Sequence, residues 1–312
     1  MFEKKIEKEI AKIRKRIPDE YNQIELLDEL TNPEIDFYMS ISNRADGKSY
    51  NYLNAFIYLA RIFDLRFLLV CEHYELQKTY LTKIAEIYET DETLKLEEHD
   101  FKKTDDFFMI YDSKVSRTIG LITDLNNASD LKYQSAVLKK YPIIIYDEFL
   151  RIASDYGSDE WERLRTIYES VDRNKEIPYI KHPKVFFLGN AVNFESPILS
   201  ALDLFNALET HEINTMKQYK NILLEMRTND IANESKNLRA FNAYDSAMTT
   251  GEFKANLYNI ITPEKRDKIR NNCRYFFIKA LGKYVKITYD IKTYYTMITI
   301  VYSTFEDDYA YC

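Results

Sequence analysis

The chain has 312 residues and a mass of 37.2 kDa, which is long enough for two compact domains. Hydrophobic residues make up 46% of it and charged residues 30%, a balance that is typical of a folded protein and excludes a disordered one. The net charge of −7 excludes a surface that is basic throughout, so we expect any contact with nucleic acid to be confined to a local patch.

Membrane and disulfide-rich classes are not expected either. No apolar run approaches the roughly 20 residues that a helix needs to cross a bilayer, and the charged N-terminus, residues 1–16, lacks the apolar core of a signal peptide. The three cysteines, Cys71, Cys273 and Cys312, are an odd number without the spacing of a metal site. We therefore expect a cytoplasmic protein with no membrane partner, no disulfide framework and no zinc site.

The first predicted element is an amphipathic helix that ends before Pro18. Four isoleucines recur at spacings of four, three and four, which places them on one helical face: Ile6, Ile10, Ile13 and Ile17. A polar connector follows, and residues 35–41 then alternate into an apolar strand. The sequence Ser-Asn-Arg-Ala-Asp-Gly-Lys-Ser, residues 42–49, comes directly after this strand and is followed by a helical pattern at residues 52–63.

Strands and helices alternate along the next part of the chain. We expect strands at residues 66–71, 107–111, 118–125, 142–146 and 184–188, and helices at residues 75–88 and 159–171. The run from Pro142 to Tyr146 is continuously apolar, as is typical of a strand buried on both faces of a parallel sheet. This alternation predicts an α/β fold with a mainly parallel sheet.

The pattern changes after Ala201. Residues 202–227 suggest a helix with polar flanks, and residues 229–242 are rich in Asn, Ser and Lys, as is typical of a linker. From Arg274 to Tyr302 the sequence predicts antiparallel strands, which we interpret as a small second domain.

A short motif stands between the strand at residues 35–41 and the helix after it. Gly47, Lys48 and Ser49 occupy the context of a Walker A loop, in which backbone N–H groups bind phosphate, the lysine reaches the β- and γ-phosphates and the serine binds Mg²⁺. Ser42 and Ala45 replace glycines of the usual loop. We expect ATP to bind at Ser42, Asn43, Arg44, Ala45, Asp46, Gly47, Lys48, Ser49 and Tyr50.

A second motif is the apolar strand that ends in Asp147 and Glu148. In a P-loop ATPase the first carboxylate holds Mg²⁺ together with the serine of the loop, here Ser49, and the second activates the attacking water. Both carboxylates can reach the ligand crevice, because they lie at the carboxyl end of the strand. Taken alone, the pattern also fits a strand followed by a solvated acidic turn, and it is the phosphate loop that favours the catalytic interpretation.

A third strand, at residues 184–188, is followed by Gly189 and Asn190. An asparagine at this place can bond both the γ-phosphate and the attacking water, and so report hydrolysis. An asparagine that caps a turn has the same sequence pattern. The sequence leaves both interpretations of Asn190 open.

Together these motifs resemble the DNA-packaging (encapsidation) ATPases of small podophages of the phi-twenty-nine kind. The resemblance covers residues 35–210 well and the tail only weakly. It is carried by Arg44 within the phosphate loop, by Tyr74, Glu75 and Leu76 after the strand Phe67–Val70, by Tyr146-Asp147-Glu148-Phe149, and by Leu188-Gly189-Asn190-Ala191-Val192.

The resemblance implies a P-loop NTPase of the ASCE type that uses ATP and Mg²⁺. It further implies a homo-oligomeric ring, commonly a pentamer, that docks on the portal of a procapsid in the host cytoplasm and translocates double-stranded DNA. A neighbouring subunit supplies an arginine in this family, and Arg173 stands at that position, although an arginine that caps a helix end has the same pattern. Lys132 and Arg151 fall in loops that the family directs toward DNA or the neighbouring subunit.

The resemblance also implies that the β-rich domain, residues 244–312, has a degenerate nuclease fold of the RNase H-like type. Asp290 stands alone among the tail strands, and residues 306–308 suggest a solvated acidic run, so we expect no nuclease activity. The rest of the chain is then a P-loop domain at residues 1–205, with a helical extension at residues 1–34, and a helical linker at residues 206–243.

Two alternatives remain from the sequence. Another ring-shaped DNA translocase or helicase would share these motifs and differs only in the family resemblance. A non-catalytic nucleotide-binding scaffold is suggested by the irregular loop at Ser42 and Ala45, and it would bind ATP without turnover. The presence of Lys48, Asp147 and Glu148 favours the ATPase.

Overall fold

The structure is a computed structural model that describes residues 2–151, 157, 159–173, 180–191, 196–228, 273–280, 283–290 and 296–301. The chain divides into two compact units, Met1–Phe253 and Lys254–Cys312, and each is described by itself. Within the described ranges no helix combines the length and the apolar character that crossing a membrane requires.

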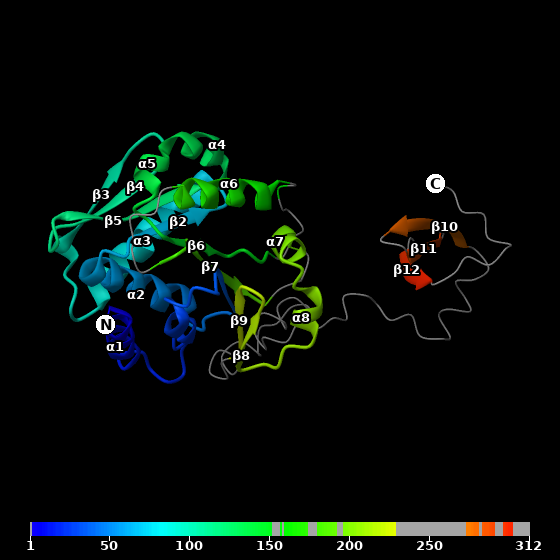
Figure 1. The fold of residues 1–312 in the computed structure, drawn as a ribbon, viewed down its shortest axis with the longest axis horizontal. Helices are drawn as coiled ribbons and strands as arrows, with labels where there is room; N and C mark the ends of the chain where they lie inside the picture. The colour runs from blue at the N-terminus through cyan, green and yellow to red at the C-terminus, as the bar shows by residue number, and fades with distance from the viewer. Residues whose placement is uncertain are drawn as a thin grey trace. The chain divides into compact units, whose positions relative to one another are not determined.

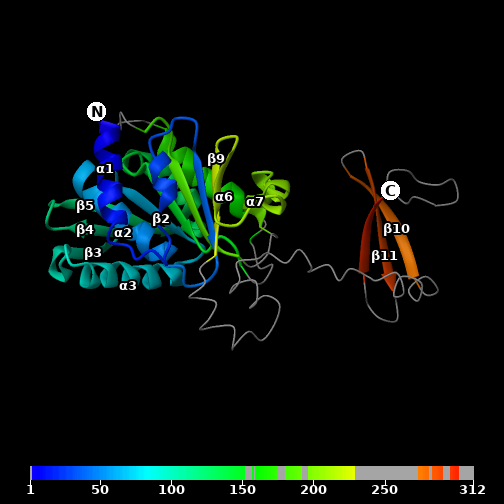
Figure 2. The same ribbon diagram turned by 90° about the horizontal axis from the view of Figure 1, so that it is seen from below.

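The first unit is a nine-stranded sheet with helices on both faces (Figures 1 and 2). Its strands are β1 (Phe37–Ser42), β2 (Phe67–Cys71), β3 (His99–Lys103), β4 (Phe108–Asp112), β5 (Arg117–Asp124), β6 (Ile143–Asp147), β7 (Lys184–Asn190), β8 (Thr215–Tyr219) and β9 (Ile222–Arg227). Its helices are α1 (Phe2–Arg14), α2 (Lys48–Phe63), α3 (Tyr74–Thr90), α4 (Ala128–Leu131), α5 (Ser135–Leu138), α6 (Glu160–Asp172), α7 (Pro197–Ala201) and α8 (Phe205–Glu209). Short 3₁₀ turns join them: η1 (Glu25–Glu29), η2 (Leu96–Glu98), η3 (Leu125–Asn127) and η4 (Lys132–Gln134).

The sheet is mixed, with a parallel centre and antiparallel edges. The strand order is β3-β4-β5-β2-β6-β7-β1-β9-β8. The central strands, in the order β5-β2-β6-β7-β1-β9, pair in parallel. Strands β3, β4 and β8 pair antiparallel at the two edges. The α/β class and the mainly parallel sheet expected from the sequence are therefore confirmed, and the edges make the sheet a mixed one.

Two hydrophobic clusters fill the space on either face of the sheet. Helices α1, α2 and α3 contribute to one cluster, and α4 to α8 contribute to the other. Within β6, Ile143 and Ile145 belong to the first cluster and Ile144 and Tyr146 to the second, as the alternation of strand side chains requires. Because both faces are covered, the sequence of this strand is continuously apolar.

The helix expected at residues 202–227 is wrong over most of its length. Only the short helix α8 forms, and residues 215–227 contain β8 and β9. Strand β9 pairs in parallel with β1, with Phe37 opposite Ile222. The carboxylate of Glu225 is buried beside Ser40 of β1 and accepts hydrogen bonds from Ser40 Oγ (2.7 Å) and Asn22 Nδ2 (3.3 Å). The main sheet thus continues into the segment that the sequence suggested as a helical linker; the rest of that linker, from residue 229 on, lies outside the described residues.

The second unit contains three antiparallel strands, β10 (Cys273–Ala280), β11 (Lys283–Asp290) and β12 (Thr296–Val301), in the order β10-β11-β12. These strands confirm the β pattern of the tail. The RNase H-like fold and the domain boundaries stay predictions. Asp290 ends β11, and the acidic run at residues 306–308 lies outside the described residues.

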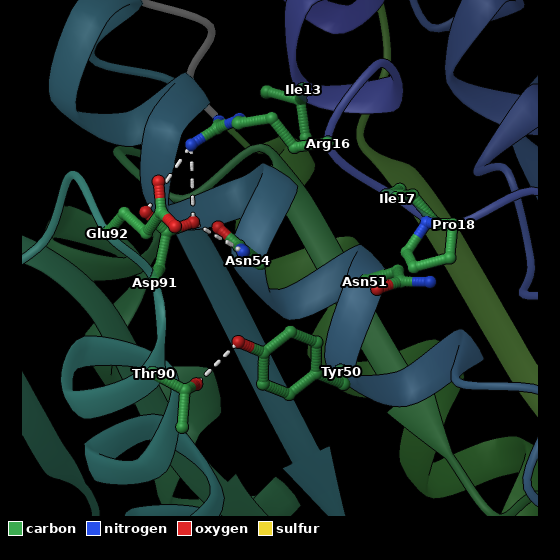
Figure 3. Close-up of a pocket in the computed structure, with 10 residues that line it drawn as sticks. All are labelled: Ile13, Arg16, Ile17, Pro18, Tyr50, Asn51, Asn54, Thr90, Asp91 and Glu92. Carbon is green, nitrogen blue, oxygen red and sulfur yellow. Dashed lines mark hydrogen bonds and ion pairs between the residues drawn. The ribbon is translucent and has the colours of Figure 1, made fainter.

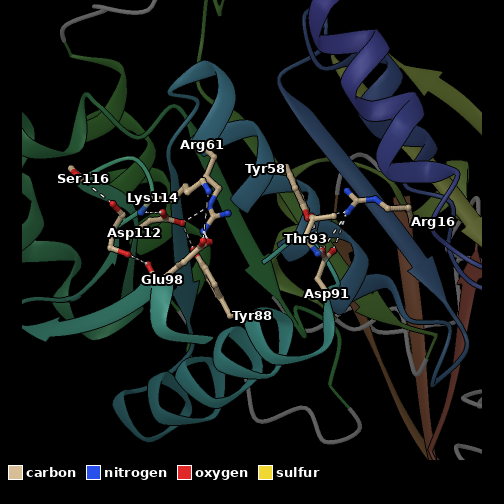
Figure 4. Close-up of polar contacts among 11 residues, drawn as sticks. Arg16, Tyr58, Arg61, Tyr88, Asp91, Thr93, Glu98, Asp112, Lys114 and Ser116 are labelled. Carbon is tan, nitrogen blue, oxygen red and sulfur yellow. Dashed lines mark hydrogen bonds and ion pairs between the residues drawn. The ribbon is translucent and has the colours of Figure 1, made fainter. Parts of the chain in front are cut away.

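A buried ion-pair cluster ties α2 to the antiparallel edge of the sheet (Figure 4). Arg61 of α2 contacts the carboxylate of Asp112 through Nε and that of Glu98 through a second nitrogen at 2.7 Å. Asp112 is fully buried and also accepts a hydrogen bond from Tyr88 Oη (2.6 Å). The charge of Asp112 is therefore balanced by a single guanidinium among the groups that contact it here.

We expect Arg61→Met to lower the free energy of unfolding by roughly 3 kcal/mol, because it leaves the buried charge of Asp112 without its cation. The matched control is Arg165→Met, since Arg165 and its partner Glu169 are both about half exposed; it should change stability by less than about 1 kcal/mol. Urea unfolding of both variants measures the difference. Equal small losses would show that the Arg61 cluster is not a stabilising contact.

Candidate active site

Three segments that are far apart in sequence meet at the carboxyl ends of the central parallel strands. Strand β7 lies between β1 and β6, and its register places Ser42 opposite Asn190 and Asp147 opposite Leu188. The three strands are parallel, so their carboxyl ends share this end of the sheet, where α/β proteins bind ligands. The loop after β1 and the polar ends of β6 and β7 therefore lie together, as the sequence predicted.

A cavity of about 310 Å³ opens at this end. Ser42 and Asn43 are fully buried and do not line it, but the other loop residues named from the sequence do. Helix α3 contributes Lys83, Glu86 and Ile87, none of which the sequence singled out. The full lining is Arg44, Ala45, Asp46, Gly47, Lys48, Ser49, Tyr50, Lys83, Glu86, Ile87, Asp147, Glu148, Gly189 and Asn190.

The loop before α2 contains two left-handed residues. Gly47, the residue before the helix, has φ of 74°, and Ala45 has φ of 68°. A Cβ atom on Gly47 would lie 3.2 Å from Tyr21 Cδ1, so both the backbone angle and the space favour glycine there. Ala45 adopts a left-handed angle without being glycine. The replacement of a glycine by Ala45 therefore keeps a left-handed turn in the loop.

Lys48 is the buried cation of the site. Its side chain begins in the first turn of α2, is only 6% exposed, and donates a hydrogen bond from Nζ to Asn190 Oδ1 at 2.7 Å. Burial lowers the pKa of Lys48, while the nearby carboxylates of Asp147, Asp46 and Glu148 oppose this shift. Asn190 thus places its amide oxygen on the lysine of the loop.

Asp147 is held by groups from two helices. Ser49 Oγ of α2 donates to Asp147 Oδ1 at 3.0 Å, and Lys83 Nζ of α3 lies 3.6 Å from Oδ2. Asp147 is 5% exposed, and its Oδ2 atom has no hydrogen bond within the described part of the chain. Sequence reasoning missed Lys83, because a lysine on a helix surface gives no signal until the helix is placed against the strand ends.

Glu148 follows Asp147 in a left-handed backbone conformation. Its φ is 59°, which is uncommon for a residue with a side chain, and its N–H donates to Asp147 Oδ1 at 3.0 Å. In a continued strand the two carboxylates would point to opposite faces of the sheet. The turn at Glu148 lets both line the cavity, and the side chain of Glu148 is exposed there.

Phe149 packs beneath this turn. Its ring is fully buried and contacts Phe187 of β7. A Cβ atom on Gly189 would lie 2.7 Å from Phe149 Cε1 and 3.2 Å from Leu150 Cγ. Residue 189 therefore has to be glycine for the segment after β6 to lie across the end of β7.

The remaining predicted residues lie away from the cavity. Arg173 is exposed at the end of α6. The preceding Asp172 is 3.7 Å from His182, which comes just before β7, so this helix end lies near the amino ends of the parallel strands and the cavity lies at their carboxyl ends. Lys132 is exposed at the start of η4. Arg151 pairs with Glu72 at 2.8 Å and Glu160 at 3.2 Å within the same chain.

A scan against models of protein families finds no match, and a search of curated proteins finds none either. Among solved structures, the chain is similar to the N-terminal domain of the DNA packaging ATPase from bacteriophage phi29, with 22% identity and a TM-score of 0.48 over 66% of this chain and 94% of that one. It is also similar to the phi29 viral genome packaging motor assembly, with 16% identity and a TM-score of 0.49 over 88% and 78%. A large terminase from a thermophilic bacteriophage, in complex with ADP, shows 9% identity and a TM-score of 0.43 over 94% and 68%.

The structural search thus finds proteins of the same group that the sequence resembles. At identities of 22% or less and TM-scores below 0.5, these similarities carry no argument about the function of this chain. The chemistry of this chain therefore rests on its own residues.

We expect Gly189→Ala to destabilise the protein by about 1–3 kcal/mol, because the added methyl group overlaps the buried ring of Phe149. Gly157→Ala is the matched control, since among the described residues a Cβ atom there would meet Asp159 Oδ1 alone, at an ordinary 3.5 Å. Urea unfolding of the two variants compares them directly. A Gly189 variant as stable as the Gly157 variant would contradict the close approach of Phe149 to β7.

Proposed function

We propose that the cavity binds and hydrolyses ATP, and that the chain is the ATPase of a viral DNA-packaging motor. The observation that carries the first part is the meeting of a buried lysine, a hydroxyl, two carboxylates and an amide in one cavity: Lys48, Ser49, Asp147, Glu148 and Asn190. These groups match the needs of phosphoryl transfer to water, which are positive charge at the phosphates, a metal site and a base for the water.

The residues present fit Mg²⁺. Asp147 Oδ2 is buried and has no hydrogen bond within the described residues, and Ser49 Oγ donates a hydrogen bond to Oδ1 of the same carboxylate. No group of three or more His, Cys, Asp or Glu side chains forms a metal cage in the described ranges, and Mg²⁺ at phosphate sites typically uses one or two protein ligands and completes its shell with phosphate and water. Ser49 and Asp147 would hold the ion. When bound, it would neutralise the charge that develops on the phosphate oxygens.

The loop and Lys48 bind the phosphates in this proposal. The N-terminus of α2 and the backbone N–H groups of the loop attract the anion, and Lys48 Nζ turns from Asn190 to the terminal phosphate. Lys48 then exchanges the neutral amide of Asn190 for a charged phosphate, which forms a stronger hydrogen bond with the ammonium group. The phosphate also favours the charged form of Lys48, whose pKa is lowered by burial.

Glu148 is the proposed general base. Glu148 is exposed and lines the cavity. Its backbone N–H donates a hydrogen bond to Asp147 Oδ1, and this bond stabilises the left-handed turn at Glu148. Glu148 takes a proton from the water as the water attacks the terminal phosphorus, and the leaving diphosphate keeps the bond electrons. In this proposal Asn190 no longer accepts the hydrogen bond of Lys48, and its amide orients the attacking water and responds to loss of the phosphate.

The packaging role rests on the sequence resemblance. It implies a homo-oligomeric ring, for which a pentamer is proposed, acting at the portal of a procapsid on double-stranded DNA. Arg173 fits such a ring, because it is exposed and lies near the end of the sheet opposite to the cavity of its own chain. We propose that it acts on the nucleotide of a neighbouring subunit. Lys132, also exposed, is the proposed DNA contact, whereas Arg151 is held by intramolecular ion pairs.

We expect Glu148→Gln to slow ATP hydrolysis by at least about 100-fold while ATP binding is kept, because only the proton acceptor is removed. The matched control is Glu162→Gln, an exposed carboxylate on α6 that should leave turnover within about twofold of the parent. Hydrolysis and equilibrium binding are measured for both variants, with and without double-stranded DNA.

Three results of this experiment separate the proposals. Turnover that DNA stimulates, and that falls steeply with salt, supports the motor, because contacts with the DNA backbone release counterions. Turnover without DNA stimulation supports an ATPase of another kind. Binding of ATP without turnover in the parent protein contradicts the enzyme and favours a nucleotide-binding scaffold.

A further inference from the structure

Lys83 is a cation of the proposed ATPase site that the reaction described above does not use. It lies near the middle of α3, and its side chain is 33% exposed. Its Nζ atom is 3.6 Å from Oδ2 of the buried carboxylate of Asp147. The ammonium group beside this oxygen therefore comes from α3 and not from the loop before α2, whose Lys48 donates to Asn190.

The ring of Tyr80 supports Lys83 in this position. Tyr80 lies one turn before Lys83 on α3 and is 3% exposed. Lys83 Nζ is 4.5 Å from the centre of the ring, which is the geometry of a cation–π contact. The ammonium group thus has two buried partners, an aromatic ring and a carboxylate oxygen.

Helix α3 is tied to α2 near its end. Tyr50 Oη of α2 is hydrogen bonded to Thr90 Oγ1 at 2.7 Å, and Asp91 accepts a hydrogen bond from Asn54 Nδ2 at 2.9 Å (Figure 3). These residues line a second cavity, of about 410 Å³, and Tyr50 lines both cavities. With α3 held in this way, Lys83 can change its partner by rotating its flexible four-carbon side chain.

Asp147 Oδ2 is also the atom that fits Mg²⁺ in the proposed function. The other oxygen, Oδ1, already accepts hydrogen bonds from Ser49 Oγ and the backbone N–H of Glu148, each at 3.0 Å. An ion on Oδ2 and an ammonium group 3.6 Å from the same atom would be close neighbours, and two cations repel each other strongly in a buried site. Lys83 therefore has to leave Oδ2 when a divalent ion binds there.

Two kinds of acceptor are available to the displaced Lys83. It lines the same cavity as the loop and Lys48, where the phosphates bind in the proposed function. A phosphate oxygen gives the ammonium group a charged acceptor in place of the carboxylate. Glu86, one turn after Lys83 on α3, also lines the cavity and is the alternative acceptor.

We propose that Lys83 competes with Mg²⁺ for Asp147 Oδ2, and that the displaced Lys83 moves to the phosphates of the nucleotide. This inference rests on the proposed function, since it concerns the same ATP and the same ion. The ion pair with Lys83 compensates the buried charge of Asp147 until the ion takes its place. Lys83 then adds positive charge to the phosphates from within the same chain and is a catalytic residue of the site.

Binding of Mn²⁺ alone to the full chain tests the competition, measured without nucleotide from the loss of the EPR signal of the free ion. Lys83→Met should bind Mn²⁺ at least about 10-fold more tightly than the parent, because the competing cation is removed. Lys83→Arg keeps the charge and should stay within about threefold of the parent. Asp147→Asn, added to Lys83→Met, should abolish the gain and so locate the ion.

Lys78→Met is the matched control for the metal measurement. Lys78 is exposed on the same helix and does not line the cavity, so loss of its charge should change Mn²⁺ affinity by less than about twofold. Equal affinities in the Lys83→Met and Lys78→Met proteins would overturn the competition, and with it the proposal.

ATP hydrolysis tests the move to the phosphates. At saturating ATP and Mg²⁺, Lys83→Met should lower kcat about 10-fold, whereas Lys83→Arg should stay within about threefold of the parent. A parent-like kcat in Lys83→Met, with an unfolding curve that shows the variant folded, would mean that Lys83 moves to Glu86 or to solvent and would overturn the proposal. Absence of turnover in the parent would instead contradict the proposed function, while the Mn²⁺ measurement would still decide the competition.

Discussion

The burial of the Lys48 ammonium is the constraint on which the site depends. A charge with only 6% exposure is costly unless it is hydrogen bonded and lies close to opposite charge. Asn190 Oδ1 accepts a hydrogen bond from Lys48 Nζ at 2.7 Å, and the negative charge of the Asp147 carboxylate stabilises the ammonium. These two groups come from the ends of β7 and β6, so the start of α2 has to lie against both strands. A parallel arrangement of β1, β7 and β6 as neighbours satisfies this requirement.

Helix α2 connects the parts of the first unit that matter for this account. Its first turns contact both cavities through Tyr50, and its last turn carries Arg61, whose ion pairs reach the antiparallel edge of the sheet. A change in the loop before α2 therefore acts on a helix that is held by ion pairs at its far end. On the other side of the loop, Ala191 N donates to Ser42 O at 2.9 Å, so the ends of β1 and β7 are also linked directly. The side chains of the proposed site thus come from the ends of strands and from helices that are tied to one another, which favours a fixed geometry.

Sequence reasoning succeeded where local chemistry decides the structure. An apolar run that ends in Asp147 and a Gly47-Lys48-Ser49 turn before a helix each carry their own signal, and parallel strands bring such ends together. It failed at Ile222–Arg227, because Glu225 is a charged residue whose burial depends on partners from elsewhere in the chain, Ser40 on the neighbouring strand and Asn22. Lys83 and the cavity beside Tyr50 depend on how α1, α2 and α3 pack, which no local pattern encodes.

A crystal structure of Glu148→Gln grown with ATP and Mg²⁺ tests the central claim most directly, because the variant retains the bound nucleotide. The account predicts the terminal phosphate against Lys48 Nζ, the ion between Ser49 and Asp147, and the Lys48–Asn190 hydrogen bond broken. A nucleotide bound elsewhere, or phosphates that leave Lys48 on Asn190, would contradict it.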